Sequence, residues 1–98
     1  MSKRTPSKPT LRKKRQLILQ PECLEDLQYW VKTDSRLATR LLRLMDEILR
    51  EPFTGTGKPE PLKGLGPNVW SRRLSEVDRL VYRVRDDAID CLQARYHY

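Results

Sequence analysis

The sequence predicts a single α+β domain in which a two-helix hairpin packs on one face of a mostly antiparallel sheet, in the order β-α-α-β-β-β. A short apolar run is followed by two segments with the apolar spacing of amphipathic helices and then by three strand-like segments. The chain has 98 residues, 38% of them hydrophobic, which is enough for one compact core and too little for two.

The N-terminal half supplies one strand and the helical hairpin. Residues 16–20 are expected to form a buried first strand, because they contain an apolar run and end at Pro21. Pro21 suits the first position of a helix that ends near Thr33. The buried face of this helix is expected to carry Leu24, Leu27 and Val31, with Cys23 and Trp30 beside them.

A second helix is predicted to begin after a cap at Asp34 or Ser35 and to end before Pro52. The turn between the helices is so short that they should form an antiparallel hairpin over one face of the sheet. The apolar residues of the second helix share one side: Leu37, Leu41, Leu44, Met45 and Ile48.

The segment 53–68 holds all four glycines and three prolines, so it is predicted to be a long structured loop, of a length that is often functional. Strands are expected at 70–75, 79–85 and 88–98. Their alternation directs these side chains toward the helices: Trp70, Leu74, Leu80, Tyr82, Val84, Leu92, Ala94 and Tyr96. The opposite, open face then carries Arg73, Arg79, Arg83, Arg85, Gln93, Arg95 and His97, and also Val81, Ile89 and Cys91, which need a cover.

The formal net charge of +7 is concentrated at the N-terminus. Residues 1–15 contain seven lysines and arginines and no acid, whereas residues 16–98 contain 13 basic and 13 acidic side chains. We therefore expect a basic, disordered arm at 1–14, either a solvated tail or an RNA-binding segment, and a single domain at 15–98.

The two cysteines and the apolar runs exclude several classes of protein. Cys23 and Cys91 lack the spacing of a zinc site or a disulfide framework, so both are predicted to be reduced packing residues. No apolar run approaches the roughly 20 residues that a membrane helix needs, and the chain shows no signal peptide. The sequence favours a cytoplasmic protein.

Two side chains could act as acid and base in RNA cleavage. His97 is the only residue whose unperturbed pKa, about 6.5, lies near neutrality, and Glu60 is the only acid in the long loop. Attack of a ribose 2′-OH on the neighbouring phosphate needs one base, one acid and nearby cations, but no metal. Composition and spacing alone leave open that these are surface residues of a basic RNA-binding domain.

Four ordered motifs resemble the YoeB/Txe toxins of toxin–antitoxin modules, within the RelE/ParE superfamily. The motifs are GKPEPLK at 57–63, WSRR at 70–73, RLVY at 79–82 and RYHY at 95–98. The resemblance covers 16–98 and implies a fold like that of microbial ribonucleases and cleavage of messenger RNA in the decoding site of the ribosome, which inhibits translation. The arm at 1–14 and the loop at 65–69 depart from the family pattern.

The resemblance also implies roles and partners. No metal or other cofactor is expected, and the implied partners are the ribosome, messenger RNA, often a second copy of the toxin, and an acidic antitoxin of the YefM/Phd type. The C-terminal segment of such an antitoxin folds onto the toxin and blocks or distorts its site. The implied roles are Glu60 as general base, His97 as general acid, Arg79 as phosphate stabiliser, Lys63 and Arg73 as RNA contacts, and Tyr98 as the residue that orients the substrate.

Two other functions stay open at this point. One is a non-catalytic, gyrase-directed toxin of the ParE type, and the other is a basic RNA-binding module. ParE-like proteins are not expected to keep Glu60, Arg79 and His97 together, so the presence of all three favours RNA cleavage.

Overall fold

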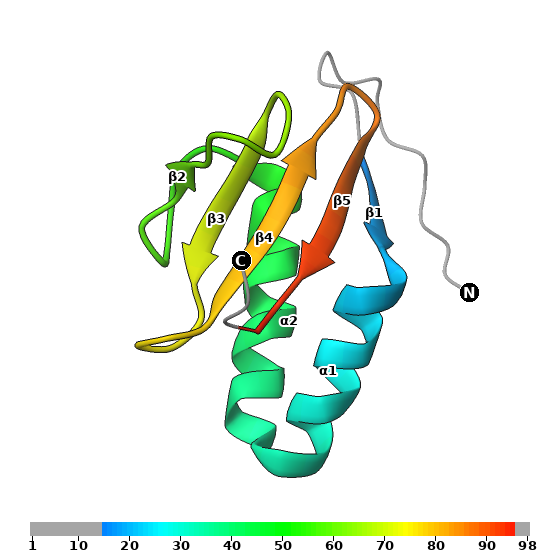
Figure 1. Cartoon of the computed structure of the whole chain (residues 1–98), viewed down its shortest axis with the longest axis vertical. Coiled ribbons are helices and arrows are strands. Elements are labelled where there is room, and N and C mark those ends of the chain that lie inside the picture. The colour runs from blue at the N-terminus through cyan, green and yellow to red at the C-terminus, as the bar shows by residue number, and fades with distance from the viewer. Residues whose placement is uncertain (1–14, 96–98) are drawn as a thin grey trace, which may run out of the picture.

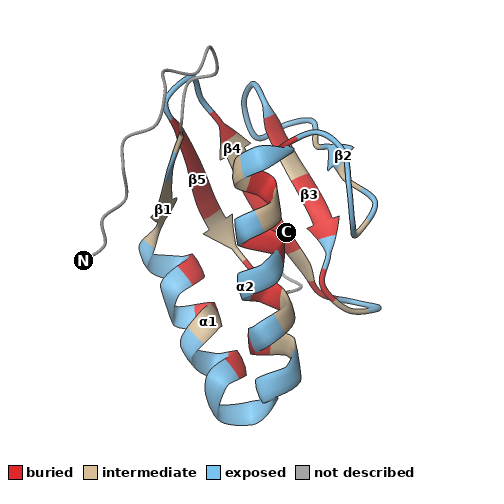
Figure 2. Cartoon of the chain, turned by 180° about the vertical axis from the view of Figure 1, so that it is seen from behind, coloured by how far each residue is buried: buried red, intermediate tan, exposed pale blue. Residues whose placement is uncertain are grey.

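The computed structural model describes residues 15–95, which form a helical hairpin layered on a five-stranded sheet (Figure 1). The sheet has the order β1-β5-β4-β3-β2, in which β1 runs parallel to β5 and every other neighbouring pair is antiparallel. Both helices cover the same face of the sheet and lie in front of it in Figure 2. The predicted α+β architecture is therefore confirmed.

The helices are α1 (Pro21–Thr33) and α2 (Ser35–Arg50), close to the bounds that the sequence predicts. Pro21 occupies the first turn of α1, where an N–H group would have no partner within the helix. Asp34 caps α2, because its carboxylate accepts a hydrogen bond from the amide nitrogen of Leu37 at 3.3 Å. Since Asp34 alone joins the two helices, they pack as an antiparallel pair.

The strands are β1 (Gln16–Leu19), β2 (Glu60–Pro61), β3 (Val69–Arg73), β4 (Arg79–Val84) and β5 (Ala88–Gln93). The sequence does not predict β2, which lies within the long loop and pairs with β3. The prediction of a buried first strand is wrong. β1 forms an edge with a neighbour on one side only, and its side chains are exposed or half-buried.

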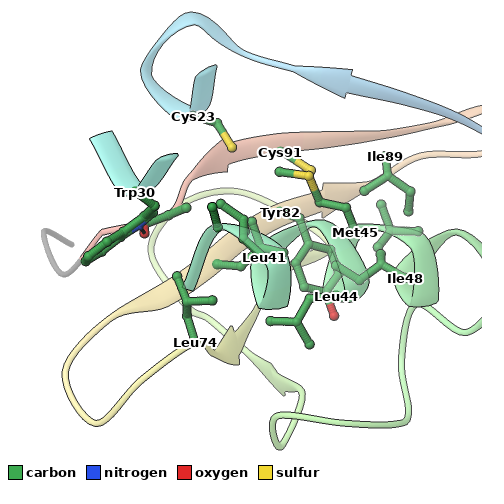
Figure 3. Close-up of a cluster of buried hydrophobic side chains, with 14 residues drawn as sticks. Cys23, Trp30, Leu41, Leu44, Met45, Ile48, Leu74, Tyr82, Ile89 and Cys91 are labelled. Carbon is green, nitrogen blue, oxygen red and sulfur yellow. Dashed lines mark hydrogen bonds between the residues drawn. The ribbon is translucent and has the colours of Figure 1, made fainter. Parts of the chain in front are cut away.

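The core lies between the hairpin and the sheet (Figure 3). The predicted buried side of α2 is confirmed for Leu41, Leu44, Met45 and Ile48, whereas Leu37 is only partly buried. The strands and the residues directly after β3 and β5 contribute Leu74, Leu80, Tyr82, Val84, Ile89, Cys91 and Ala94.

Both cysteines are reduced and buried, as predicted. Figure 3 shows the two sulfurs facing each other between α1 and β5. A hydrogen bond with the Cys23 thiol, together with burial, raises the pKa of the Cys91 thiol well above its usual range. The Cys91 thiol therefore stays uncharged and serves packing.

The predicted buried side of α1 is wrong for Leu24 and Val31, whereas Leu27 packs partly buried against the core as predicted. Leu24 and Val31 are 44% and 59% exposed, whereas Cys23, Asp26 and Trp30 are buried. Hydrogen bonds explain this orientation. The side chains of Asp26 and Trp30 turn inward because both bind the backbone of Ala94, just beyond the end of β5.

The predicted orientation of β5 is only half correct. The register opposes Val81 to Gln93 but Tyr82 to Cys91, so β5 contains an extra residue, a β-bulge. Side chains on the two sides of a bulge follow different alternations. Ala94 therefore faces the helices as predicted, while Ile89 and Cys91 face them against the prediction and Leu92 does not join the core.

Candidate functional site

Glu60 is held on the open face of the sheet by β2. In the register it lies opposite Ser71 of β3, and hydrogen bonds on either side fix the segment: Arg73 N donates to Gly57 O at 2.7 Å, and Leu62 N donates to Val69 O at 2.8 Å. The glutamate side chain is 53% exposed. A carboxylate is thereby presented to solvent from a fixed stretch of backbone.

Arg79, at the start of β4, reaches across β3 to this carboxylate. Its Nη1 lies 3.3 Å from Glu60 Oε1 and also donates to Ser71 Oγ at 3.2 Å. Ser71 is fully buried and the Arg79 side chain is 23% exposed, so the guanidinium is anchored on its sheet side and open on the other. The structure thus brings together the predicted base and the predicted phosphate-binding cation.

Of the other predicted cations, Arg73 lies beside this pair and Lys63 lies in the adjoining loop. Arg73 pairs with Arg79 in the register of β3 and β4, and its side chain is exposed. Lys63 is also exposed and follows β2 in the loop that returns to β3. Arg83 lies on the same face of β4 as Arg79 and donates to Leu65 O at 3.2 Å, which ties this loop to the sheet.

His97 and Tyr98 lie outside the described residues, but the structure shows how the chain just before them is held. Asp26 Oδ2 accepts a hydrogen bond from Ala94 N at 2.8 Å, and Trp30 Nε1 donates to Ala94 O at 2.9 Å. The Arg95 guanidinium lies 3.7 Å from the centre of the Tyr29 ring. Helix α1 therefore fixes the point from which the last three residues depart.

The chain segment that leads to Glu60 is held by Arg72, a residue to which the sequence alone assigned no role. Arg72, directly beside the predicted Arg73, points toward the helices with a fully buried side chain and binds the loop that precedes Glu60. Strand alternation could have found it, since Arg72 shares its side of β3 with Trp70 and Leu74. An arginine directed into a core is unusual and indicates a specific partner.

The site combines a carboxylate with a guanidinium on an exposed surface rich in arginine. Such a pair can take up a proton and stabilise a phosphoryl oxygen side by side. Among residues 15–95, no three His, Cys, Asp or Glu side chains are grouped closely enough to hold a metal ion. Neither described helix is long and apolar enough to span a bilayer.

The fold is shared with solved bacterial toxins. The YoeB/ParE toxin from Agrobacterium tumefaciens is 38% identical, with a TM-score of 0.79 over 85% of this chain and 99% of that one. The YoeB dimer from Staphylococcus aureus is 32% identical, with a TM-score of 0.79 over 87% of this chain and 99% of that one. By fold, this chain is thus a small toxin of a toxin–antitoxin system.

Sequence similarity gives the family. Residues 19–98 match the YoeB-like toxins of bacterial type II toxin–antitoxin systems, and the chain belongs to this family. Toxin YoeB of Mycobacterium bovis is 48% identical over 84 residues, which are 86% of this chain and 99% of the relative. In the heterotetrameric YoeB-YefM toxin–antitoxin complex from S. aureus, the toxin is 33% identical, with a TM-score of 0.76 over 86% of this chain and 98% of that one.

Proposed function

We propose that this toxin is a metal-independent endoribonuclease that cleaves messenger RNA on the ribosome and so inhibits translation. The observation that carries the proposal is the contact between Glu60 and Arg79 at 3.3 Å on an exposed face. A base and a cation at this separation can act on one RNA linkage at the same time, the base on the attacking 2′-OH of the ribose and the cation on the phosphoryl oxygens.

In the proposed reaction, the Glu60 carboxylate removes the proton from a ribose 2′-OH, and the 2′-oxygen forms a bond to the adjacent phosphorus. The bond from phosphorus to the 5′-oxygen breaks, and His97 donates a proton to that oxygen. The products are a 2′,3′-cyclic phosphate and a 5′-hydroxyl. The proposed reaction needs neither a redox partner nor a metal ion.

The remaining residues of the site bind and orient the RNA. Arg79 stabilises the charge that develops on the phosphoryl oxygens, helped by its anchor on Ser71. Arg73, which is opposite Arg79 in the register, and Lys63, in the loop after β2, are both exposed and contact the flanking phosphates. Tyr98 orients the nucleotide at the cleavage point.

The test is cleavage of a defined messenger RNA, with and without ribosomes and in the presence of EDTA. The purified toxin is expected to release 5′-hydroxyl ends from the messenger RNA when ribosomes are present. The EDTA concentration is kept low enough to leave the ribosomes intact. Glu60→Gln and His97→Gln should each lower the single-turnover rate by about 100- to 10,000-fold. Full cleavage by a folded His97→Gln variant would remove histidine as the acid.

The same preparation separates the alternative functions. Inhibition of DNA gyrase with intact messenger RNA would make the chain a ParE-like toxin. Binding to RNA that weakens steeply with salt but leaves no products would make it a basic binding module.

We further propose that an acidic, YefM-like antitoxin folds onto this chain, blocks or distorts its site and pairs its acidic groups with the exposed arginines of the open face. The S. aureus relative is known in such a complex and also as a dimer, so we include a homodimer in the proposal. Action on ribosomes places the protein in the cytoplasm. Co-purification with the product of the reading frame immediately upstream, followed by sedimentation analysis, tests both partners.

A further inference from the structure

The side chain of Arg72, the next-to-last residue of β3, is fully buried on the helix side of the sheet. Three of its partners are backbone carbonyls of the segment 51–56, which joins α2 to the loop of Glu60. Nη1 donates to Thr56 O at 3.2 Å, Nη2 donates to Thr54 O at 2.7 Å, and Nη2 also binds Glu51 O. One guanidinium therefore gathers three backbone carbonyls of a segment that has no helix or strand of its own.

Two further side chains complete this network. Glu47 of α2 lies 3.5 Å from Arg72 Nη1 and accepts hydrogen bonds from the amide nitrogen and the hydroxyl of Thr56 at 3.1 and 3.3 Å. Tyr82 accepts from Arg72 Nε at 3.2 Å and donates to Pro52 O at 2.7 Å. Burial raises the pKa of Tyr82, so its hydroxyl remains protonated and able to donate.

The two glycines of this loop fit closely against the network. A Cβ on Gly55 would lie 2.5 Å from Glu47 Oε2 and 3.0 Å from Arg72 Nη1. A Cβ on Gly57 would lie 3.0 Å from Arg73 O and 3.2 Å from Arg72 Cβ. Both glycines have positive φ angles, +126° and +87°. The chain thus packs directly on Arg72 before it turns toward Glu60.

The position of Glu60 depends on this attachment because β2 itself is short. Two residues pair with β3, and the nearest preceding bond to that strand is the one from Arg73 N to Gly57 O. Glu60 and Arg72 lie on opposite faces of the sheet, since Glu60 is opposite Ser71 in the register. The influence of Arg72 on Glu60 therefore passes through the backbone and not through a direct contact.

We propose that Arg72 is a positioning residue for the reaction proposed above, on which this inference rests: by binding the carbonyls of 51–56 it sets where the backbone presents the Glu60 carboxylate to the RNA. A lysine cannot replace it. The planar guanidinium offers several N–H groups in fixed directions, whereas an ammonium group is a compact charge at the end of a flexible chain.

The test compares Arg72→Lys with Arg36→Lys, an arginine-to-lysine change at an exposed position of α2, outside the proposed site. Arg72→Lys is expected to lower the single-turnover rate about 100-fold, the loss associated with displacement of a reacting group by about 1 Å, with little change in KM. Backbone amides at 54–62 should exchange hydrogen faster, while those of β4 and β5 keep their protection. Arg36→Lys should change neither the rate nor the local exchange.

A second variant covers the case in which Arg72→Lys does not fold. Tyr82→Phe keeps the ring in the core and removes only the hydroxyl, so it should show the same local exchange with a smaller loss of rate. A folded variant with unchanged rate, or with faster exchange across the whole sheet, would overturn the positioning role. Absence of products from the unmodified toxin would instead overturn the proposed function. Hydrogen exchange of the amides at 54–62 would still show whether Arg72 holds this loop in place.

Discussion

Glu60 and Arg79 are unremarkable when each is considered alone. An acid between two prolines and an arginine at the start of a strand are both common on protein surfaces. Their relation comes from β2, which places Glu60 opposite Ser71 and so within reach of Arg79. The sequence does not predict this strand, because a two-residue pairing carries no periodic pattern. Motif resemblance identified the residues, and backbone pairing explains why they meet.

Arg79→Lys tests whether the geometry of the guanidinium matters in addition to its charge. A lysine keeps the positive charge but lacks the rigid group of N–H donors that contacts both Glu60 and Ser71. We expect the single-turnover rate to fall by about 100- to 1,000-fold, the usual loss when one preorganised donor is removed. Arg36→Lys, an exposed change on α2, serves as the control. An unchanged rate for Arg79→Lys would mean that charge alone suffices.

At the scale of elements, the sequence predicted both helices and the positions of four of the five strands, because these segments have clear patterns of apolar residues. It failed where one element depends on a distant one. The buried side of α1 is decided by Asp26 and Trp30, whose partner Ala94 lies more than 60 positions away in the sequence. The bulge in β5 is a single extra residue, and the amino-acid composition of the strand does not indicate its position.

Trp30→Phe tests the attachment of α1 to the end of β5. The indole N–H donates to Ala94 O, and phenylalanine leaves this buried carbonyl without that donor. We expect the free energy of unfolding to fall by about 1–3 kcal/mol, measured by urea denaturation. The amides of Ala94 and Arg95 should also exchange faster. Val31→Ala, on the exposed side of α1, should be nearly neutral.

The ion pair between Arg85, directly after β4, and Asp90 of β5 predicts a dependence of stability on pH. Arg85 Nε and Nη2 donate to Asp90 at 2.9 and 3.0 Å, and these hydrogen bonds hold the pKa of Asp90 below its usual value. A lowered pKa in the folded state stabilises the fold above the unfolded value of about 3.9, and this stabilisation is lost as the pH falls through the folded value.

Asp90→Asn should therefore lower the melting temperature at pH 7, and the difference from the unmodified protein should disappear at pH values below the pKa of Asp90 in the fold. Asp46→Asn is the matched control. Asp46 also pairs with an arginine, Arg50, at 3.0 Å, but both side chains are about two-thirds exposed, and such pairs contribute little. A loss of stability at pH 7 that persisted undiminished at low pH would show that packing, and not charge, explains the effect of Asp90→Asn.

For the whole molecule, the two faces of the sheet have different tasks. The helix side contains the core and the buried polar contacts of Arg72 and Tyr82, which fix backbone. The open side presents Glu60, Arg73 and Arg79 to solvent. The formal net charge gives no sign of this difference between the two faces. Residues 16–98 are formally neutral, and the excess of seven positive charges lies at 1–15.

This separation leads to a prediction for the basic arm. Residues 1–14 lie outside the described part of the chain and contain six lysines and arginines. We propose that they add affinity for ribosomal RNA without sequence preference, while residues 15–98 carry the chemistry. Each phosphate contact that is lost lowers the slope of log affinity against log salt by about 0.7 to 0.9. Deletion of 1–14 should thus reduce this slope by up to about five and weaken ribosome binding most at low salt.

The single-turnover rate on saturated ribosomes should not change, since the pair Glu60–Arg79 is untouched by the deletion. A full-length variant with the six basic residues of the arm replaced by glutamine is the matched control, because it keeps chain length and removes only charge. Equal effects of the deletion and the replacement would assign the affinity to charge. An unchanged salt slope in both would mean that the arm makes no contact with RNA phosphate, and that ribosome affinity resides in the arginine-bearing face of the sheet.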